Sequence, residues 1–306
     1  MTILVARNDC SSGFDDVQIA YLPPVYGFEC CVGFVCNVGA IFFLLTRERP
    51  DWHTGVIFSL NLAVCDLIYA LTLPLPVVYY ARGKHWIFGD PLCKVLRFVF
   101  TCNLYGSIFF ITCISLNRYV AIVHPLFTNS HIKTKHAKVV SVCVWILILV
   151  ICSPIAKFAS TPVSSNRTHC ETASGKDDEE SYLSYSLFLT VFGCAVPFLA
   201  TCASYYCILR EVGRSHSISA QDKHKVALMV GAVVSLYFVS FIPYHVFRNV
   251  NQYLKVHDAT RCNISVYNVY QVTKGLITLN MCVHPLLYAS LMESCRARCC
   301  GGNPTA

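Results

Sequence analysis

Residues 137–155 read AKVVSVCVWILILVICSPI, an apolar stretch long enough to cross a membrane as a helix. The hydrocarbon core is ~30 Å thick and takes about 20 apolar residues in an α-helix. Similar stretches recur along the chain, at residues 26–45, 55–79, 92–123, 184–209, 226–246 and 266–291. Each is expected to be helical, because a segment in lipid must satisfy its own backbone hydrogen bonds. The sequence therefore predicts an all-α membrane protein, a bundle of seven transmembrane helices.

The composition favours a membrane protein over a soluble one. The chain is 55% hydrophobic and only 13% charged, which is far from the balance of a soluble domain. Residues 1–20 contain no apolar run flanked by small residues, so we expect the first helix, rather than a cleavable signal peptide, to direct insertion. We predict one domain: an extracellular tail over residues 1–25, the seven-helix domain over 26–291 and a short cytoplasmic tail over 292–306.

Cysteines and glycosylation sequons orient this bundle. Most of the 19 cysteines lie inside apolar stretches, where they act as small hydrophobic side chains. The exceptions lie in loops or at helix mouths on one side of the membrane: Cys10, Cys93, Cys170 and Cys262. Four cysteines allow three pairings, and their spacing does not choose among them. Sequons beginning at Asn166 and Asn263 fall on the same side. We expect that side to be oxidising and extracellular, with the amino terminus outside the plasma membrane.

Three cations lie within the outer ends of the predicted helices: Arg97, Arg248 and Lys274. The numbers of lysine and arginine residues predicted on the two sides of the membrane are nearly equal, whereas membrane proteins usually carry more of them on the inner side. When Arg97, Arg248 and Lys274 are left out of the count, the inner side has the larger number. Ionisable residues inside membrane helices usually face the bundle interior with a partner, and no buried acid is expected beside these cations. The missing partner is then a ligand with several negative charges. The alternative is that each side chain snorkels independently to lipid headgroups.

Further polar and aromatic residues share helix faces with the cations, because residues three or four apart on a helix are neighbours. They are His245 beside Arg248, Gln271 beside Lys274, and Thr101 and Tyr105 on the stripe that leads inward from Arg97. Arginine suits bidentate recognition of phosphate, and lysine acts as a point charge. A phosphate-bearing molecule with an aromatic base fits this arrangement. Packing is the alternative role for Tyr105.

Landmark residues follow one another along the predicted helices. They are Gly33 and Asn37, Leu62, Ala63 and Asp66, Cys93, Asn117, Arg118 and Tyr119, Trp145, Pro197 and Tyr205, Pro243, and Pro285 with Tyr288. In this combination the chain resembles the rhodopsin-like G-protein-coupled receptors over essentially its whole length. Residues 98–107 (FVFTCNLYGS), 243–248 (PYHVFR) and 270–276 (YQVTKGL) further resemble the purinergic receptors for extracellular nucleotides. The resemblance is closest to the adenosine-triphosphate-responsive member that signals through phosphoinositide and cyclic AMP routes.

The resemblance implies an extracellular nucleotide, ATP, as ligand and heterotrimeric G proteins as partners. It assigns the phosphate chain to Arg97, Arg248 and Lys274, with Lys274 standing where many members carry Arg. It assigns further pocket positions to Tyr105, His245 and Gln271. It also implies the disulfides Cys93–Cys170 and Cys10–Cys262. Other anionic ligands, such as lysophospholipids, leukotrienes or small carboxylates, are the alternative within the same receptor class.

The same resemblance implies an activation switch made of Asp66, Arg118, Tyr205, Pro243 and Tyr288. Asn117 replaces the usual acid beside Arg118, which predicts a weaker inactive lock and some basal signalling. The class has a sodium site, for which Asp66, Ser107 and Asn280 are the candidate ligands here. His284 stands where the class carries Asp or Asn, and it is expected to compete by pairing with Asp66. The two alternatives are a sodium ion held by these ligands and a His284–Asp66 pair in its place.

Other function classes fit the sequence less well. We find no glycine-rich phosphate loop and no cluster of metal ligands, so we expect no enzyme and no cofactor. A pump needs ionisable residues through the membrane middle, where we identify only Asp66. Membrane lipid is an expected partner and nucleic acid is not. The acidic run at residues 177–180 is expected to be a solvated part of an outer loop. Cys299 and Cys300 follow the last helix and permit S-palmitoylation, with unmodified thiols as the alternative.

Overall fold

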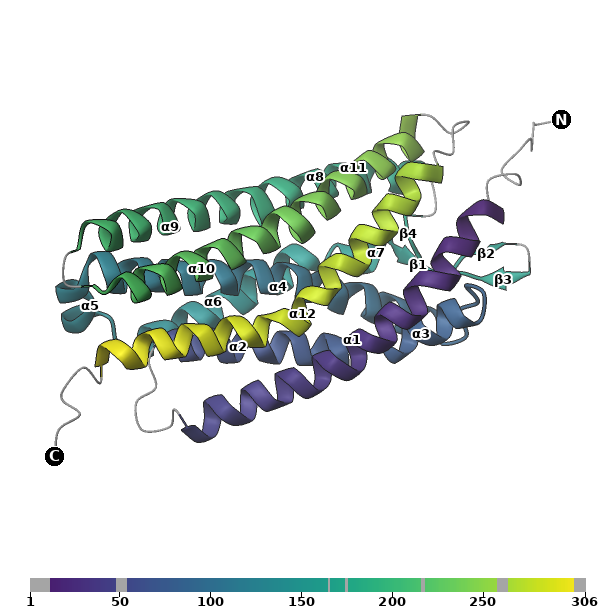
Figure 1. Cartoon of the computed structure of the whole chain (residues 1–306). Helices are drawn as coiled ribbons and strands as arrows, with labels where there is room; N and C mark the ends of the chain where they lie inside the picture. Colours follow the sequence, from purple (N-terminus) through teal and green to yellow (C-terminus); the bar gives the residue numbers. More distant parts are fainter. Residues whose placement is uncertain are drawn as a thin grey trace.

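A computed structural model describes residues 12–47, 54–164, 166–173, 176–215, 218–257 and 264–299. These residues form a lengthwise bundle of helices (Figure 1). The helices are α1 (Ser12–Arg47), α2 (Thr54–Ala70), α3 (Pro74–Ala81), α4 (Gly89–Val123), α5 (Pro125–His131), α6 (Thr134–Cys152), α7 (Ile155–Phe158), α8 (Lys176–Thr190), α9 (Val196–Arg214), α10 (Ala220–Leu236), α11 (Ile242–His257) and α12 (Ile264–Cys299). Two short π-helical segments, η1 (Val191–Ala195) and η2 (Tyr237–Phe241), join α8 to α9 and α10 to α11.

The helices form membrane-spanning segments at the positions that the sequence predicts. Within the described residues, six segments are long and apolar enough to cross a membrane: Gln18–Thr46, Thr54–Ala81, Gly89–Val123, Thr134–Phe158, Asp178–Arg214 and Ala220–His257. The seventh predicted span lies in α12, a 36-residue helix that packs against α1, α2, α10 and α11. Its inward face carries buried polar side chains such as Gln271, Lys274 and His284, which lower its apolar character. The predicted seven-helix bundle is confirmed, and its helices extend into both predicted tails, to Ser12 and to Cys299.

Prolines set the breaks within the long spans. Pro74 begins α3 directly after the turn that ends α2, and Pro154 separates α6 from α7. Proline lacks an N–H and its ring clashes with the preceding turn, so it kinks or interrupts a helix. Pro197 and Pro243 each lie just after a π-helical segment, in which one turn is wider than in an α-helix. Ser186 lies on α8, which η1 joins to α9, and Arg248 lies on α11, which η2 joins to α10. Each of these two spans therefore contains an irregular turn on the inner side of the named residue.

The apolar surface is distributed as lipid requires. The exposed face of α6 carries Val142, Ile146 and Val150, four residues apart, with 58%, 57% and 64% of each side chain exposed. A soluble monomer rarely exposes such a continuous apolar stripe. The interior contains the large side chains of Phe110, Tyr237, Phe241, Tyr244 and other residues, and it also buries many polar groups. This distribution fits a bundle surrounded by hydrocarbon.

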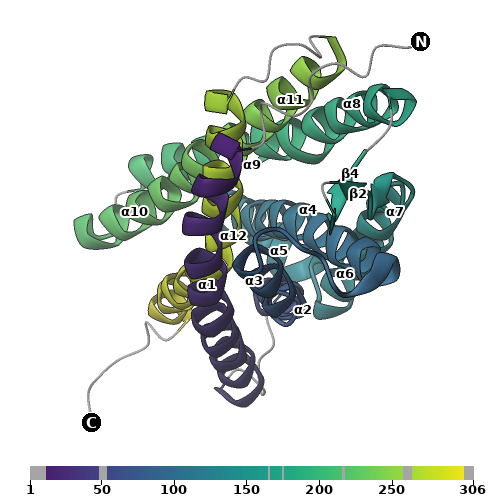
Figure 2. The same cartoon turned by 90° about the vertical axis from the view of Figure 1, so that its right-hand side faces the viewer.

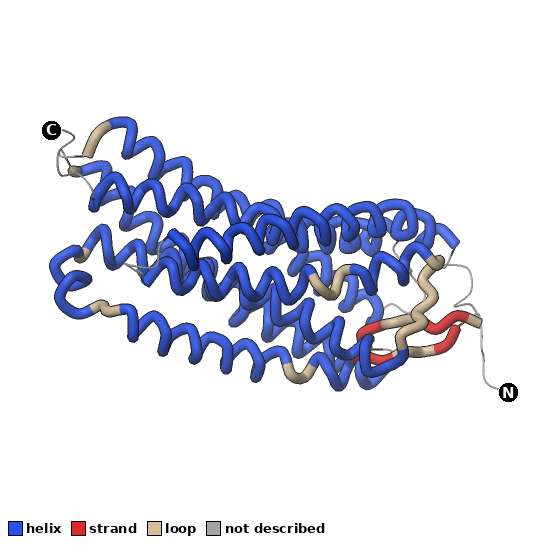
Figure 3. Tube along the Cα trace, turned by 90° about the horizontal axis from the view of Figure 1, so that it is seen from below, coloured by secondary structure: helices blue, strands red, loops and turns tan. Residues whose placement is uncertain are grey.

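Four short strands lie at one end of the bundle. β1 (Ala159–Ser160) pairs antiparallel with β4 (Glu171–Thr172), and β2 (Val163–Ser164) pairs antiparallel with β3 (Arg167–Thr168). Figure 2 looks onto this end, and Figure 3 shows the strands gathered there while the rest is helical. A disulfide joins Cys93, in the first turn of α4, to Cys170, which immediately precedes β4. The predicted Cys93–Cys170 bond is confirmed.

The first and last helices are packed very closely. An added Cβ on Gly33 of α1 would lie 2.8 Å from Cε of Met281, and one on Gly275 of α12 would lie 2.8 Å from the Tyr21 hydroxyl oxygen. Asn37 Nδ2 donates a hydrogen bond of 3.0 Å to the backbone carbonyl of Met281. Glycine at these two positions allows the close approach, so α1 supports the helix that carries Lys274.

Candidate functional site

Arg97 is fixed between α4 and the strand-bearing loop. It lies one turn after Cys93 on α4, and its Nη2 donates a hydrogen bond to the backbone carbonyl of Cys170. The disulfide therefore holds both ends of this contact together. The Nε atom of Arg97 is buried without a hydrogen-bond partner. Thr101, one turn further inward, donates its hydroxyl to the Arg97 carbonyl at 2.8 Å.

Arg248 is 5% exposed and reaches into the bundle from α11. Its Nη2 donates to the Tyr105 hydroxyl at 3.3 Å and to the Ser186 carbonyl at 3.1 Å. The guanidinium carbon also lies 5.5 Å from the centre of the Tyr244 ring, within the range of a cation–π contact. Its Nε atom has no hydrogen-bond partner. Neutral groups thus surround this cation.

Lys274 extends from α12 toward the same space and is 8% exposed. Its Nζ lies 5.7 Å from the centre of the Phe100 ring. The ion pairs found among the described residues, Lys94–Asp90 and His284–Asp66, do not involve Lys274, Arg97 or Arg248. Burying a cation without a counter-charge is costly, so these three side chains favour a negatively charged partner.

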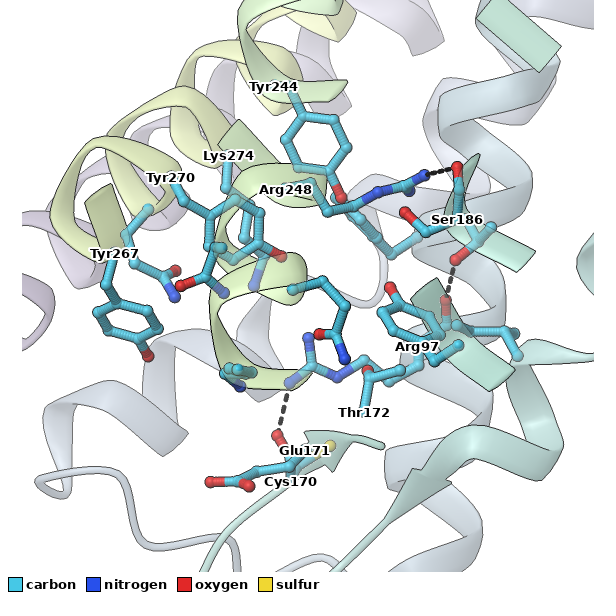
Figure 4. Close-up of a pocket in the computed structure, with 18 of the residues that line it drawn as sticks. Arg97, Cys170, Glu171, Thr172, Ser186, Tyr244, Arg248, Tyr267, Tyr270 and Lys274 are labelled. Atoms are coloured by element: carbon cyan, nitrogen blue, oxygen red, sulfur yellow. Dashed lines mark hydrogen bonds between the residues drawn. The ribbon is translucent and has the colours of Figure 1, made fainter. Parts of the chain in front are cut away.

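The three cations line one cavity, with a volume of about 110 Å³, at the strand-bearing end (Figure 4). Figure 4 shows them entering from separate helices, with Tyr244, Tyr267 and Tyr270 on the α11 and α12 side. Thr101 and Gln271 also line the cavity, and Gln271 Oε1 has no hydrogen-bond partner. The sequence-based prediction that the cations converge agrees with this geometry. Sequence reasoning missed the tyrosines that line the cavity: Tyr79, Tyr80, Tyr182, Tyr185, Tyr244, Tyr267 and Tyr270.

Tyr105 and His245 lie behind the cavity wall and do not line it. The Tyr105 ring is fully buried, and an added Cβ on Gly193 of η1 would lie 2.5 Å from its Cε1 atom. The His245 ring packs 5.8 Å from the Tyr105 ring, centre to centre, and its Nδ1 lies 3.2 Å from the Thr190 hydroxyl. Both side chains therefore lie beside Arg248 rather than on the cavity surface, and contact of either one with a ligand stays a prediction.

One buried acid was missed by the sequence-based reasoning. Glu29 of α1 is completely buried, and its Oε1 accepts a hydrogen bond of 2.9 Å from the hydroxyl of Thr278 on α12. Its second oxygen, Oε2, has no hydrogen-bond partner. Thr278 lies one turn inward from Lys274 on α12, and the hydrogen bond joins this part of α12 to α1. Glu29 is the fourth residue of the predicted span 26–45, so it lies toward the outer end and leaves the expectation for the membrane middle unchanged.

The acidic run at residues 177–180 also differs from its expected form. Instead of a solvated part of an outer loop, it forms the first turns of α8, where negative charge is favoured by the helix dipole. Asp178 and Glu180 are exposed, whereas Glu179 is 8% exposed. Gln252 Nε2 of α11 donates to the Glu179 backbone carbonyl at 3.1 Å. These acids therefore lie beside the cavity mouth as part of a helix.

The predicted switch residues lie along the inner half of the bundle. The Tyr205 hydroxyl accepts a hydrogen bond of 2.9 Å from Ser115, and Arg118 is half-buried at the inner end of α4. Asn117, which stands in place of the usual acid, accepts a hydrogen bond from the Thr54 hydroxyl at the start of α2. Asn117 therefore bonds to a neighbouring helix. Pro243 directly follows Ile242, the first residue after η2.

The candidate sodium ligands are hydrogen-bonded to protein groups. Asp66 accepts hydrogen bonds from Asn103 at 2.8 Å and from Ser107 at 3.4 Å, and its Oδ2 lies 2.7 Å from His284 Nδ1. The Asn280 side-chain oxygen accepts a hydrogen bond of 3.0 Å from Ser240. Within the described part of the chain, no group of three or more His, Cys, Asp or Glu side chains is arranged to hold a metal ion.

Several predicted residues lie outside the described residues. These are Cys10, Cys262, Asn263, Cys300 and the side chains of Tyr288 and Cys299. Asn166 is described and exposed, with a positive backbone φ of 60° in the turn between β2 and β3. An exposed turn is a position that an N-linked glycan can occupy, and glycosylation there stays a prediction.

Comparison with known proteins identifies the family. A family model described as "7 transmembrane receptor (rhodopsin family)" matches residues 36–288. Purinoceptor 11 of Homo sapiens is 38% identical over 325 residues, covering 98% of this chain and 86% of the relative. Purinoceptor 1 of Gallus gallus is 37% identical over 298 residues, covering 96% and 82%. Purinoceptor 1 of Homo sapiens is 37% identical over 286 residues, covering 92% and 76%. The chain therefore belongs to the rhodopsin family of seven-transmembrane receptors, which are not enzymes, and within it to the purinoceptors.

Proposed function

We propose that this protein is a plasma-membrane receptor activated by an extracellular nucleotide, ATP, and that it signals through heterotrimeric G proteins. The observation that carries the proposal is the cavity whose wall holds three cations, the half-buried Arg97 of α4 and the buried Arg248 of α11 and Lys274 of α12, together with a set of tyrosines. A chain of phosphates supplies the negative charge that these cations lack within the protein. Tyrosine rings offer an aromatic base both stacking surfaces and hydroxyl groups.

The disulfide at the cavity end supports an extracellular orientation of the cavity. Disulfides form and persist on the oxidising side of a membrane, and the Cys93–Cys170 bond lies beside Arg97. The cavity then opens to the outside, and α1 begins at the same end of the bundle, with the amino terminus extracellular (Figure 1). Glycosylation at Asn166, in the exposed turn of this end, is consistent with that orientation.

Each cation would take a distinct part in binding. Arg97 and Arg248 both have an Nε–H without a partner, so each can add a hydrogen bond to a phosphate oxygen without losing an existing one. Lys274 supplies a point charge from the opposite side. Gln271 offers an unpaired oxygen to a donor on the ligand, such as an amino group.

Activation would follow from drawing these helices together. A ligand shifts a two-state receptor only through its different affinity for the two states, and a polyanion gains most where the three cations lie closest. The irregular turn at η2 and Pro243 allows α11 to move relative to α10. The inner switch residues Arg118, Tyr205 and Tyr288 would then rearrange to admit a G protein. Phospholipase C and adenylate cyclase are the two proposed outputs.

The test is a signalling assay in receptor-null cells that express the chain at matched surface levels. Inositol phosphate and cyclic AMP are measured across a panel of nucleotides, with wild type, Arg248→Ala and Arg248→Lys compared. Removing one partner of a buried charged contact costs about 2–5 kcal/mol, so Arg248→Ala is expected to reduce nucleotide potency by roughly 30-fold or more. Arg248→Lys keeps the charge and loses the planar fork, so its loss is expected to be smaller.

Arg82 provides the matched control cation. It is exposed, it follows α3 at the same end of the bundle, and it does not line the cavity. Arg82→Ala is expected to leave potency unchanged. If well-expressed wild type responds to no nucleotide but does respond to a lysophospholipid, a leukotriene or a small carboxylate, the nucleotide proposal is wrong and the cation cavity serves another anion.

A further inference from the structure

The rhodopsin-like class has a sodium site at the position of Asp66, and the side chains around Asp66 determine whether an ion fits here. Asp66 and His284 are 0% and 1% exposed, at the centre of the bundle. Asp66 Oδ1 accepts hydrogen bonds from Asn103 and Ser107, and Oδ2 lies 2.7 Å from His284 Nδ1. Both carboxylate oxygens are thus engaged by protein groups.

The cavity beside this cluster offers few free oxygen atoms. It is small, with a volume of about 10 Å³, and its wall includes Asn103, Ser107, Thr278, Asn280 and His284. The Asn280 oxygen accepts from Ser240, and the Thr278 hydroxyl oxygen lies 2.9 Å from Glu29. The buried polar atoms of this wall that have no hydrogen-bond partner are both nitrogens, Asn280 Nδ2 and His284 Nε2.

These donors do not suit sodium. A hard alkali cation takes oxygen ligands, and the amide –NH₂ of Asn280 carries only hydrogens toward the cavity. The imidazole of His284 reaches Asp66 from α12, at the position from which a further oxygen ligand would have to come. Sodium would have to displace His284 from Asp66 and leave a second buried imidazole nitrogen unpaired, which is costly in the bundle interior.

We propose that His284 takes the place of the sodium ion as the permanent partner of Asp66, so that this receptor is insensitive to sodium. The contact between α2 and α12 is then made by two side chains. It persists whatever the ionic composition inside or outside the cell. The inference concerns the bundle core and does not rest on the identity of the ligand at the outer cavity.

The experiment measures thermal unfolding of the full chain, without nucleotide, in detergent. Sodium chloride is compared with potassium chloride and choline chloride at equal ionic strength. A ligand that binds only the folded state stabilises it in proportion to the logarithm of its concentration over its dissociation constant. Wild type is expected to unfold at one temperature in all three salts. His284→Asp replaces the imidazole by a carboxylate, and it is expected to unfold at a higher temperature in sodium than in the other two salts.

Asp66→Asn combined with His284→Asp serves as the matched control and is expected to lose the sodium effect. A selective stabilisation of wild type by sodium would overturn the proposal, as would a folded His284→Asp that sodium fails to stabilise. If His284→Asp does not fold, wild type alone decides the question through the same comparison of salts. As a second readout, agonist affinity of His284→Asp is expected to change by about fivefold or more between sodium and choline, whereas that of wild type is expected to stay constant. Because the melting measurement uses no nucleotide, its result is independent of the proposed ligand.

Discussion

Replacing Gly193 by alanine should damage the cation cavity from behind. An alanine Cβ at this position would lie 2.5 Å from Cε1 and 2.7 Å from Cδ1 of the Tyr105 ring. Carbon atoms pack at about 3.5–4.0 Å, so the ring has to move by about 1 Å. The Tyr105 ring is fully buried, so it cannot swing aside as the flexible end of an exposed side chain could. Tyr105 also accepts the 3.3 Å hydrogen bond from Arg248, which is already long.

The expected size of the effect follows from this overlap. Inserting a methyl group into a well-packed core typically costs about 1–3 kcal/mol. If all of this strain were relieved by displacing Arg248, nucleotide potency would fall by about fivefold to 150-fold, since each 1.4 kcal/mol is a factor of ten, so partial relief sets a loss below that range. The remainder should lower the unfolding temperature. Both effects arise although Gly193 does not line the cavity.

The loss of affinity and the loss of stability are separated by measuring nucleotide affinity and the unfolding temperature on the purified receptor. Gly213→Ala on α9 is the matched control, because an added Cβ there has no neighbour within 4 Å. It is expected to be neutral or slightly stabilising, since alanine favours helix over glycine. If Gly193→Ala unfolds and binds like Gly213→Ala, the proposed support of Arg248 by Tyr105 is refuted.

Three further outcomes are expected from other parts of the bundle. Glu29→Gln keeps a hydrogen-bond acceptor for Thr278, whereas Glu29→Ala leaves a cavity that costs about 2–5 kcal/mol. The glutamine variant should therefore unfold at the higher temperature, and the reverse order would contradict a structural role for the Glu29–Thr278 hydrogen bond. Asn117→Asp restores an acid at the inner end of α4 and should lower ligand-free inositol phosphate output, and an unchanged output would show that no lock is missing. Cys170→Ser should remove about 2–5 kcal/mol of stability and reduce surface expression measured by flow cytometry, while the exposed, unpaired Cys143→Ser should not.

The sequence allowed the bundle and the cation cluster to be predicted because both depend on regular geometry. Apolar length identifies a membrane helix, and the positions of Arg97, Arg248 and Lys274 near helix ends place them at one mouth. Tyr105 was predicted to face the ligand, but helix periodicity does not reveal that η1 brings Gly193 against its ring. A wider π-helical turn changes which residues meet, and a spacing rule for ideal helices cannot anticipate it.

Glu29 shows a second limit of sequence reasoning. A single acid within an apolar stretch (residues 26–36, YGFECCVGFVC) does not alter its overall apolar character, and its partner Thr278 is a common helix residue. Only the packing of α1 on α12 joins them. The acidic run at residues 177–180 was assigned to a loop because charge suggests solvent, whereas these residues form the start of α8. Long-range contacts and the outer extensions of helices therefore had to come from the structure.

The contact between Glu29 and Thr278 also has a consequence for how the chain is made. The two residues are separated by 249 positions in the sequence. At ribosomal rates of about 5–20 residues per second, the first helix enters the membrane on the order of 10–50 s before its partner has been synthesised. Throughout that interval a carboxyl group sits in a newly inserted helix without the hydroxyl that it bonds in the finished receptor. Assembly of the bundle is therefore completed only when its last helix arrives beside its first, and a chain that stalls before α12 would present an unsatisfied acid to the quality-control machinery of the membrane.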